Sequence, residues 1–271
     1  MNRSEFILSC QNGDLEMVKK LISRRVDEPQ NSDLSLLINC GFSWASENGH
    51  LKMVEYLLKN KADVTNQNNS AIRWASKNGH LKIVEYLVKN GADVTAQDNE
   101  AVCWASMNGY LKIVEYLIKV GADITARNNR AVRWASEEGR LEMVEYLIKN
   151  GADVTDHDNS TIIWTSRWGR LEMVKYLVKN GADVTAQNNS AVYWASVYGR
   201  LETVEFLLKM GADINRLTPG HKLYFQMKRA YSKWRRVYLK GWIRKVLIPL
   251  YYSPHLRGGI QAKEDLLCCI N

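Results

Sequence analysis

The sequence lacks an apolar run long enough to cross a membrane or to act as a secretion signal. No stretch of its 271 residues approaches the roughly 20 consecutive apolar residues of a membrane-spanning helix. Cysteine is also scarce, and the five cysteines are odd in number, scattered and without the Cys-x-x-Cys pairs of zinc sites. We therefore expect a soluble cytoplasmic protein with reduced thiols and with no metal or cofactor.

Short motifs of the common enzyme classes are missing as well. The chain has no Gly-x-x-x-x-Gly-Lys phosphate loop, no Gly-x-Ser-x-Gly elbow and no His-Glu-x-x-His sequence. Paired carboxylates do occur at Glu137 and Glu138, but adjacent residues on a helix point apart and cannot share one reacting group. We expect no catalytic residues and no enzymatic activity.

What the sequence does contain is one unit repeated along most of its length. Tryptophan recurs every 30 residues from Trp44 to Trp194, a glycine follows each tryptophan five residues later, and the pair Ala-Asp recurs with the same period. A fixed period in this range indicates stacked supersecondary units, each of which buries its apolar face against its neighbours. The tryptophans are Trp44, Trp74, Trp104, Trp134, Trp164 and Trp194.

Each unit is predicted to fold as two short helices. In the copy around Trp74, a first helix should end at Gly79, because glycine tolerates the left-handed conformation that closes a helix. A second helix then runs to Gly91, with apolar residues on one face and charged residues such as Lys82 on the other. Its apolar stripe consists of Leu81, Val84, Leu87 and Val88.

The unit resembles the ankyrin repeat in its second half, where Gly79-His80, Val84, Leu87 and Gly91-Ala92-Asp93 match the family pattern. The resemblance implies an all-α ankyrin-repeat solenoid that binds proteins. The first half departs from the pattern, because the Thr-Pro and His positions are occupied by other residues, such as Ser70 and Arg73. The period is also shorter than the usual 33. Repeats of this shortened kind resemble those encoded by giant viruses of amoebae.

The missing residues fall between the Ala-Asp pair and the next first helix, where the family has a β-hairpin finger. We therefore predict tight turns without strand pairing at these junctions. An asparagine occurs at each junction, and we predict that it caps the N-terminus of the following first helix. These residues are Asn69, Asn99, Asn129, Asn159 and Asn189.

The chain divides into three predicted parts. Residues 1–39 form an N-terminal capping repeat and a linker, in which the glycine skeleton is kept but the tryptophan is absent. Residues 40–215 form six regular repeats, and residues 216–271 form a basic tail. This tail holds 12 Lys and Arg against 2 Asp and Glu, whereas the rest of the chain is nearly neutral.

The tryptophan column admits two interpretations. The first is a ladder of buried side chains that stack between repeats, each worth ~1.5–3 kcal/mol. The second is a ligand-binding row of aromatic residues. The strict period favours the first.

Binding residues should lie where the copies differ, because the invariant positions hold the stack together. In ankyrin proteins the corresponding positions line the concave face. The last two repeats are aromatic there, whereas earlier repeats carry charges and amides, and aromatic residues near arginine are typical of interface hot spots. The candidate protein-binding residues are Ile163, Arg167, Trp168, Tyr193, Val197 and Tyr198. The alternative is that the chain's own tail covers this patch.

The tail is predicted to contain a basic amphipathic helix from Leu223 to about Leu247. It could cap the last repeat through Trp234, Tyr238 and Trp242, or it could bind nucleic acid or an anionic surface. The candidate anion-binding residues are Lys228, Arg229, Lys233, Arg235, Arg236, Lys240, Arg244 and Lys245.

These observations predict a monomeric, non-enzymatic scaffold or adaptor that binds a protein partner, such as a host factor, on the concave face of the repeats. The alternative is a protein that binds nucleic acid or an anionic surface through the tail. The two differ in salt dependence, since binding of polyanions by the tail should weaken steeply with ionic strength.

Overall fold

The computed structural model describes residues 3–23, 32–217, 219–222 and 225–226. The chain divides into two compact units, Met1–Arg216 and Leu217–Asn271. The predicted tail helix, with its capping and anion-binding side chains, lies outside the described residues.

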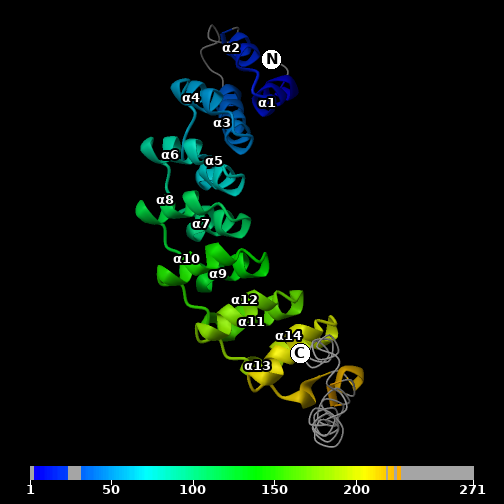
Figure 1. Cartoon of the computed structure of the whole chain (residues 1–271). Helices are drawn as coiled ribbons and strands as arrows, with labels where there is room; N and C mark the ends of the chain where they lie inside the picture. The colour runs from blue at the N-terminus through cyan, green and yellow to red at the C-terminus, as the bar shows by residue number, and fades with distance from the viewer. Residues whose placement is uncertain (1–2, 24–31, 218, 223–224, 227–271) are drawn as a thin grey trace, which may run out of the picture. The chain divides into compact units, whose positions relative to one another are not determined.

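Helix pairs follow one another in chain order along the first unit (Figure 1). Its described residues contain no strand, which confirms the all-α stack and the loss of the hairpin fingers. The first helices of repeats one to seven are α1 (Arg3–Asn12), α3 (Ser32–Glu47), α5 (Asn66–Lys77), α7 (Ala96–Asn108), α9 (Ala126–Glu137), α11 (Asp156–Trp168) and α13 (Ala186–Val197). The second helices are α2 (Leu15–Ser23), α4 (Leu51–Lys59), α6 (Leu81–Lys89), α8 (Leu111–Lys119), α10 (Leu141–Lys149), α12 (Leu171–Lys179) and α14 (Leu201–Lys209), and a 3-10 turn, η1 (Ile214–Arg216), ends the unit.

Glycine ends both helices of a repeat, as the sequence predicts. Gly79 after α5 and Gly91 after α6 have φ of +85° and +93°, in the left-handed region that side chains disfavour. Repeat two carries Lys61 at the second of these positions, with φ of +69°. The same turn is therefore made there by a residue that does not favour it.

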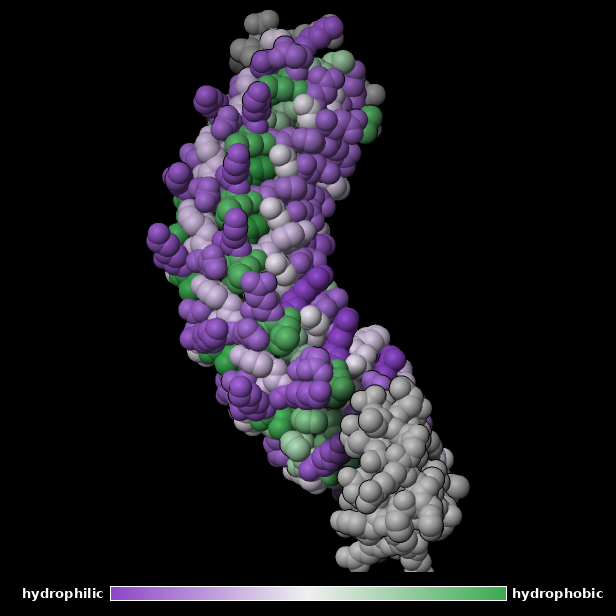
Figure 2. Space-filling view, viewed as in Figure 1, coloured by the Kyte–Doolittle hydropathy of each residue, from purple (hydrophilic) through white to green (hydrophobic). Residues whose placement is uncertain are grey.

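The core consists of small residues on the first helices and larger aliphatic residues on the second. In repeat three, Ala71 and Ala75 of α5 are buried, as are Val84 and Leu87 of α6. Small residues let neighbouring first helices approach closely, and the second helices supply the apolar volume. Figure 2 shows the outcome on one face, a hydrophilic surface interrupted by apolar patches that recur from one helix pair to the next.

Each junction from repeat three onward contains three consecutive residues in the left-handed region, just before the regular part of the first helix begins. In repeat three these are Gln67, Asn68 and Asn69, with φ of 49°, 55° and 61°. Asparagine and aspartate tolerate this conformation better than other residues with side chains, and they occupy most of these positions. The shortened finger is thus a left-handed turn.

The predicted capping role of the junction asparagines is wrong. Asn69 Oδ1 accepts a hydrogen bond of 2.7 Å from the backbone N–H of Asp93, which follows the second helix of the same repeat, rather than one from its own helix. Asn39 makes the same bond to Asp63 at 2.7 Å. The bond recurs for Asn99 with Asp123, Asn129 with Asp153, Asn159 with Asp183 and Asn189 with Asp213. We call this series of six bonds the asparagine ladder.

The aspartate of each ladder bond also closes its own turn. Asp93 Oδ1 accepts hydrogen bonds from the backbone N–H of Thr95 at 2.8 Å and from its hydroxyl at 2.7 Å. Asp153 makes the same two bonds to Thr155. These bonds lower the pKa of Asp153 below its ordinary value of 3.8, because they stabilise the ionised carboxylate.

Neighbouring repeats are also joined at the positions where the ankyrin pattern has Thr and His. Arg73 of repeat three forms a half-buried ion pair with Glu100 of repeat four, and the hydroxyls of Ser43 and Ser70 lie 2.6 Å apart. These pairs differ from junction to junction. They therefore replace the missing hydroxyl–imidazole bonds with contacts particular to each pair of repeats.

Candidate protein-binding face

The tryptophan column lies at the surface of the first helices rather than in the core. None of the six tryptophans is buried, and Trp44 and Trp164 are 37% and 40% exposed. Their neighbours Ala75 and Ser76 in repeat three are buried, so each tryptophan stands at the edge of the packed face. The expectation of a buried ladder was therefore wrong. We call the surface that carries this column the first-helix face.

Cationic side chains lie among these aromatic rings in the middle repeats. The rings of Trp74 and Trp104 stack between repeats three and four, with centroids 5.1 Å apart. The Lys77 ammonium lies 4.5 Å and 5.0 Å from the two centroids. In repeat five the Arg130 guanidinium lies 4.9 Å from the centroid of Trp134. Such cation–π contacts stabilise half-exposed rings that burial alone does not hold.

Repeats six and seven concentrate this arrangement around one arginine. The Arg167 guanidinium lies 4.6–5.7 Å from the centroids of four rings, and its Nη2 donates a hydrogen bond of 2.5 Å to the Tyr198 hydroxyl. Its Nε is buried and has no hydrogen-bond partner among the described residues. The four ring contacts and the bond to Tyr198 hold Arg167 at the centre of the group. We call Arg167 with Trp164, Trp168, Trp194 and Tyr198 the aromatic cluster.

Most of the candidate residues at this end of the array are exposed. Trp168 is 50% exposed, Tyr193 38%, Val197 42% and Tyr198 41%. Tyr193 also contacts the cluster, since its ring lies edge-on to Trp194 with centroids 5.2 Å apart. Ile163 differs from the others because it is only 6% exposed. It belongs to the core and offers no surface to a partner.

The residue after each first-helix glycine reaches back to the preceding repeat. His80 Nε2 lies 2.9 Å from the backbone oxygen of Glu47, and in repeat seven Arg200 Nε donates to the backbone oxygen of Arg167 at 3.3 Å. A Cβ on Gly169 would lie 2.6 Å from Arg200 Cδ. Arg200 is therefore held directly beside the aromatic cluster.

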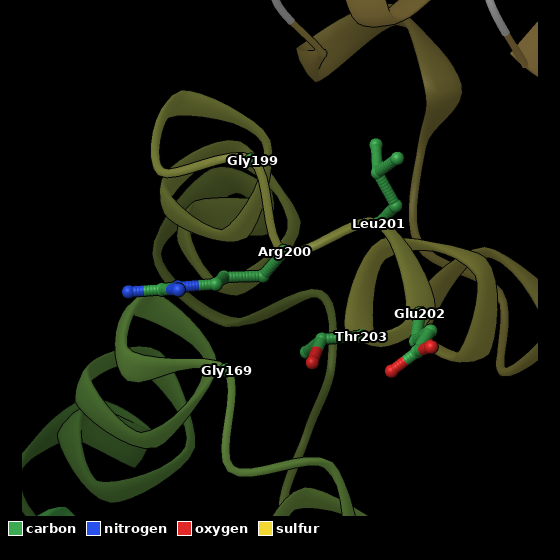
Figure 3. A pocket seen from close by; sticks show the side chains of 6 residues that line it. All are labelled: Gly169, Gly199, Arg200, Leu201, Glu202 and Thr203. Carbon is green, nitrogen blue, oxygen red and sulfur yellow. The ribbon is translucent and has the colours of Figure 1, made fainter.

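A pocket of about 370 Å³ opens at the start of α14 (Figure 3). One buried residue in its lining, Thr203, escaped the sequence argument. At the corresponding positions of repeats two to six stand Met53, Ile83, Ile113, Met143 and Met173, all of which are buried. A single threonine in an apolar column was the signal that could have identified it. The lining residues are Gly169, Gly199, Arg200, Leu201, Glu202 and Thr203.

The described residues offer little to a metal or to covalent chemistry. They contain no group of three His, Cys, Asp or Glu side chains that could hold a metal ion. Cys10 and Cys103 are buried, and burial raises the pKa of each thiol to about 12. Both thiols are protonated at neutral pH and are poor nucleophiles. Among the described helices, none is long and apolar enough to cross a membrane.

The comparison with protein families agrees with this architecture. The family model described as ankyrin repeats in three copies matches residues 6–98, 96–158 and 135–218. No curated protein matches the chain. The matched segments cover more than half of the sequence, so the chain belongs to the ankyrin-repeat family. Ankyrin repeats are in general modules of protein–protein interaction.

Proposed function

We propose that the protein is a non-enzymatic adaptor that binds a protein partner on the first-helix face of repeats six and seven. The observation that supports this proposal is the aromatic cluster around Arg167, with Trp168 and Tyr198 each more than two-fifths exposed. Tryptophan, tyrosine and arginine are the residues most enriched in interface hot spots. Trp168 stands where repeats three, four and five carry Asn78, Asn108 and Glu138.

The arrangement of the cluster suits binding because it is preorganised. Arg167 is fixed by four rings and by its bond to Tyr198, so a partner would order few side chains on docking. Fewer ordered side chains mean a smaller entropic cost of association. The competing occupant is the chain's own residues 216–271, which carry 12 basic residues against 2 acidic. A surface that already contains arginine disfavours such a basic segment.

A double variant, Trp168→Asn with Tyr198→Asn, tests the proposal. Asparagine already occurs at this position in repeats two to four, as Asn48, Asn78 and Asn108, so the fold accepts it. The matched control is Val120→Asn, which also exchanges an exposed apolar residue for the asparagine that other repeats use there, as in Asn90.

The measurement is affinity capture from cells that express the protein, followed by quantitative mass spectrometry. Proteins captured by the wild type should also be captured by the control and lost by the double variant. Equal capture by all three chains would contradict the proposed site.

A second candidate function rests on the charge of residues 216–271, which carry a net charge of +10. It is binding of nucleic acid or an anionic surface by the tail. The salt dependence of binding separates the two functions, because contacts with polyanions weaken steeply as ionic strength rises, whereas docking on the aromatic cluster changes little. The giant-virus origin, a host factor as partner, a cytoplasmic setting and a monomeric state are further proposals, which the repeat type suggests.

A further inference from the structure

The pocket at the start of α14 adjoins the aromatic cluster. Gly169 and Gly199, two of its lining residues, directly follow Trp168 and Tyr198 in the chain. Arg200 lines the pocket and also donates a hydrogen bond to the backbone oxygen of Arg167. A partner segment that lies on the cluster therefore passes the mouth of the pocket.

A buried polar side chain without a partner faces this pocket. Thr203 is 2% exposed and lines the pocket, and none of the hydrogen bonds among the described residues involves its hydroxyl. Its oxygen is not fully enclosed, so the hydroxyl can pair with water or with a ligand from the side of the pocket. Met or Ile fills the equivalent space in the five preceding repeats. Repeat seven thus has a shorter, polar side chain where the other regular repeats have a longer apolar one.

The electrostatics of the pocket favour an anion. Its floor is the first turn of α14, a helix of nine residues whose N-terminal amides carry partial positive charge. The Arg200 side chain adds a full positive charge. Among the described residues that line the pocket, only Glu202 is acidic. In Figure 3 the Arg200 side chain extends away from Thr203, toward the end of the preceding first helix, and Leu201 and Glu202 point in other directions.

We propose that this pocket receives a carboxylate of the partner, so that the segment bound by the aromatic cluster is an acidic peptide. The inference rests on the proposed protein-binding function and specifies its partner. The carboxylate accepts hydrogen bonds from the Thr203 hydroxyl and from the amides of the first turn, and the positive charge of Arg200, whose Nε is bound to the Arg167 backbone oxygen, attracts it. An aspartate or glutamate therefore stands next to the residue that packs on Trp168 or Tyr198.

A random peptide library displayed against the immobilised full-length chain tests this inference. Peptides selected by the wild type should be enriched in aspartate or glutamate next to an aromatic or aliphatic residue. Thr203→Met restores the apolar column and fills the pocket, so its selected peptides should lose the acidic preference but keep the apolar one. Val120→Asn, the matched control, should select the same peptides as the wild type.

Affinities of one selected peptide then separate the contributions. Thr203→Val keeps the shape of the side chain but removes the hydroxyl, and it should weaken binding about 10- to 100-fold, as expected for a hydrogen bond to a charged group. Replacing the peptide's glutamate by glutamine should remove most of this difference. Thermal unfolding of both Thr203 variants verifies that they are folded.

The outcomes distinguish failure of this inference from failure of the proposed function. Selected peptides without an acidic preference, or with one that Thr203→Met leaves intact, would overturn the inference and leave the binding function standing. Absence of any selected peptide would overturn both. Inorganic phosphate, titrated by calorimetry, is the remaining arm, and a phosphate affinity above that of the peptide would show that the pocket is a site for free anions instead.

Discussion

The junctions between repeats and the ends of the first helices differ in how they vary along the array. At the junctions the same asparagine bonds the same aspartate amide in six successive repeats, and the turn around it is left-handed from repeat three onward. At the ends of the first helices the side chains change from Lys77 and Asn78 in repeat three to Arg167 and Trp168 in repeat six.

This difference shows how a repeat protein separates stability from recognition. Each repeat contacts only its neighbours, so the same junction can serve between every pair of repeats. A change at one junction weakens the stacking of the repeats that it joins and so lowers the stability of the array. The first-helix ends are half exposed and carry little of the packing. They are therefore free to differ, and repeats six and seven use this freedom to build the aromatic cluster.

The largest expected effect follows from breaking one bond of the asparagine ladder. Asn69→Ala should destabilise the array by about 2–4 kcal/mol, because it removes the partner of the Asp93 amide and places alanine in a left-handed conformation. Asn68→Ala is the matched control, since Asn68 has the same conformation but an exposed side chain. Its loss should stay below about 1 kcal/mol. Equal losses in urea unfolding would show that the ladder bond contributes nothing.

A smaller effect is expected from filling a first-helix turn. Gly109→Val should destabilise the array by ~1–3 kcal/mol, because Gly109 has a φ of +82°, which a β-branched residue does not tolerate. Lys82→Ala, on the exposed face of α6, should change stability by less than about 0.5 kcal/mol. Thermal unfolding of both variants measures the difference. A loss for Lys82→Ala as large as that for Gly109→Val would mean that the faces of the repeat are misassigned.

The second-helix turn of repeat two offers a change in the opposite direction. Lys61→Gly should stabilise the array by about 0.5–1 kcal/mol, because Lys61 has a φ of +69° at a position where the following repeats have glycine. Lys59→Gly, two residues earlier at the end of α4, should destabilise by about 1 kcal/mol, since glycine weakens a helix. Chemical unfolding checks the two signs, and a loss of stability for Lys61→Gly would contradict the assigned turn.

The smallest effect concerns the aspartate turns. The pKa of Asp153 is lowered in the folded state, so its carboxylate contributes stability that is full above about pH 3.8 and is lost as the pH falls through the folded pKa. Thr155→Val removes the hydroxyl bond but keeps the backbone bond. The pKa of Asp153, followed by NMR titration, should therefore be higher in this variant than in the wild type. An unchanged or lower pKa would assign the shift to another cause.

The helices and their ends could be predicted from the sequence because their causes are local. Apolar spacing defines the stripe of a helix, and Gly79 and Gly91 end helices through their own φ. The asparagine ladder could not be predicted in the same way, because Asn69 bonds a residue 24 positions away. Its period was visible, but a period does not reveal which group the side chain contacts.

The candidate site could be predicted only in part, again because a period does not reveal what a side chain contacts. Periodicity located the variable positions but did not tell exposure from burial. At one and the same position of the repeat Tyr193 is 38% exposed, whereas Ile163 is 6% exposed, because a branched aliphatic side chain ends within the packed face and a tyrosine extends beyond it. Trp164 was expected to be buried between repeats and lies at the surface, where the Arg167 guanidinium stacks on its ring. Which side chains surround Arg167 depends on the stacking of repeats six and seven.

Stability and binding, measured together on variants of the two regions, test most directly whether the ladder stabilises and the first-helix face binds. Trp168→Asn with Tyr198→Asn should abolish capture of the partner while lowering the melting temperature by no more than about 4 °C, which corresponds to roughly 1 kcal/mol in a protein of this size. Asn69→Ala should lower the melting temperature further, and at a temperature where it is still folded it should capture the same partner as the wild type. If instead the double variant unfolds the array as much as Asn69→Ala does, or binds the partner unchanged, the separation between a stabilising ladder and a binding face is contradicted.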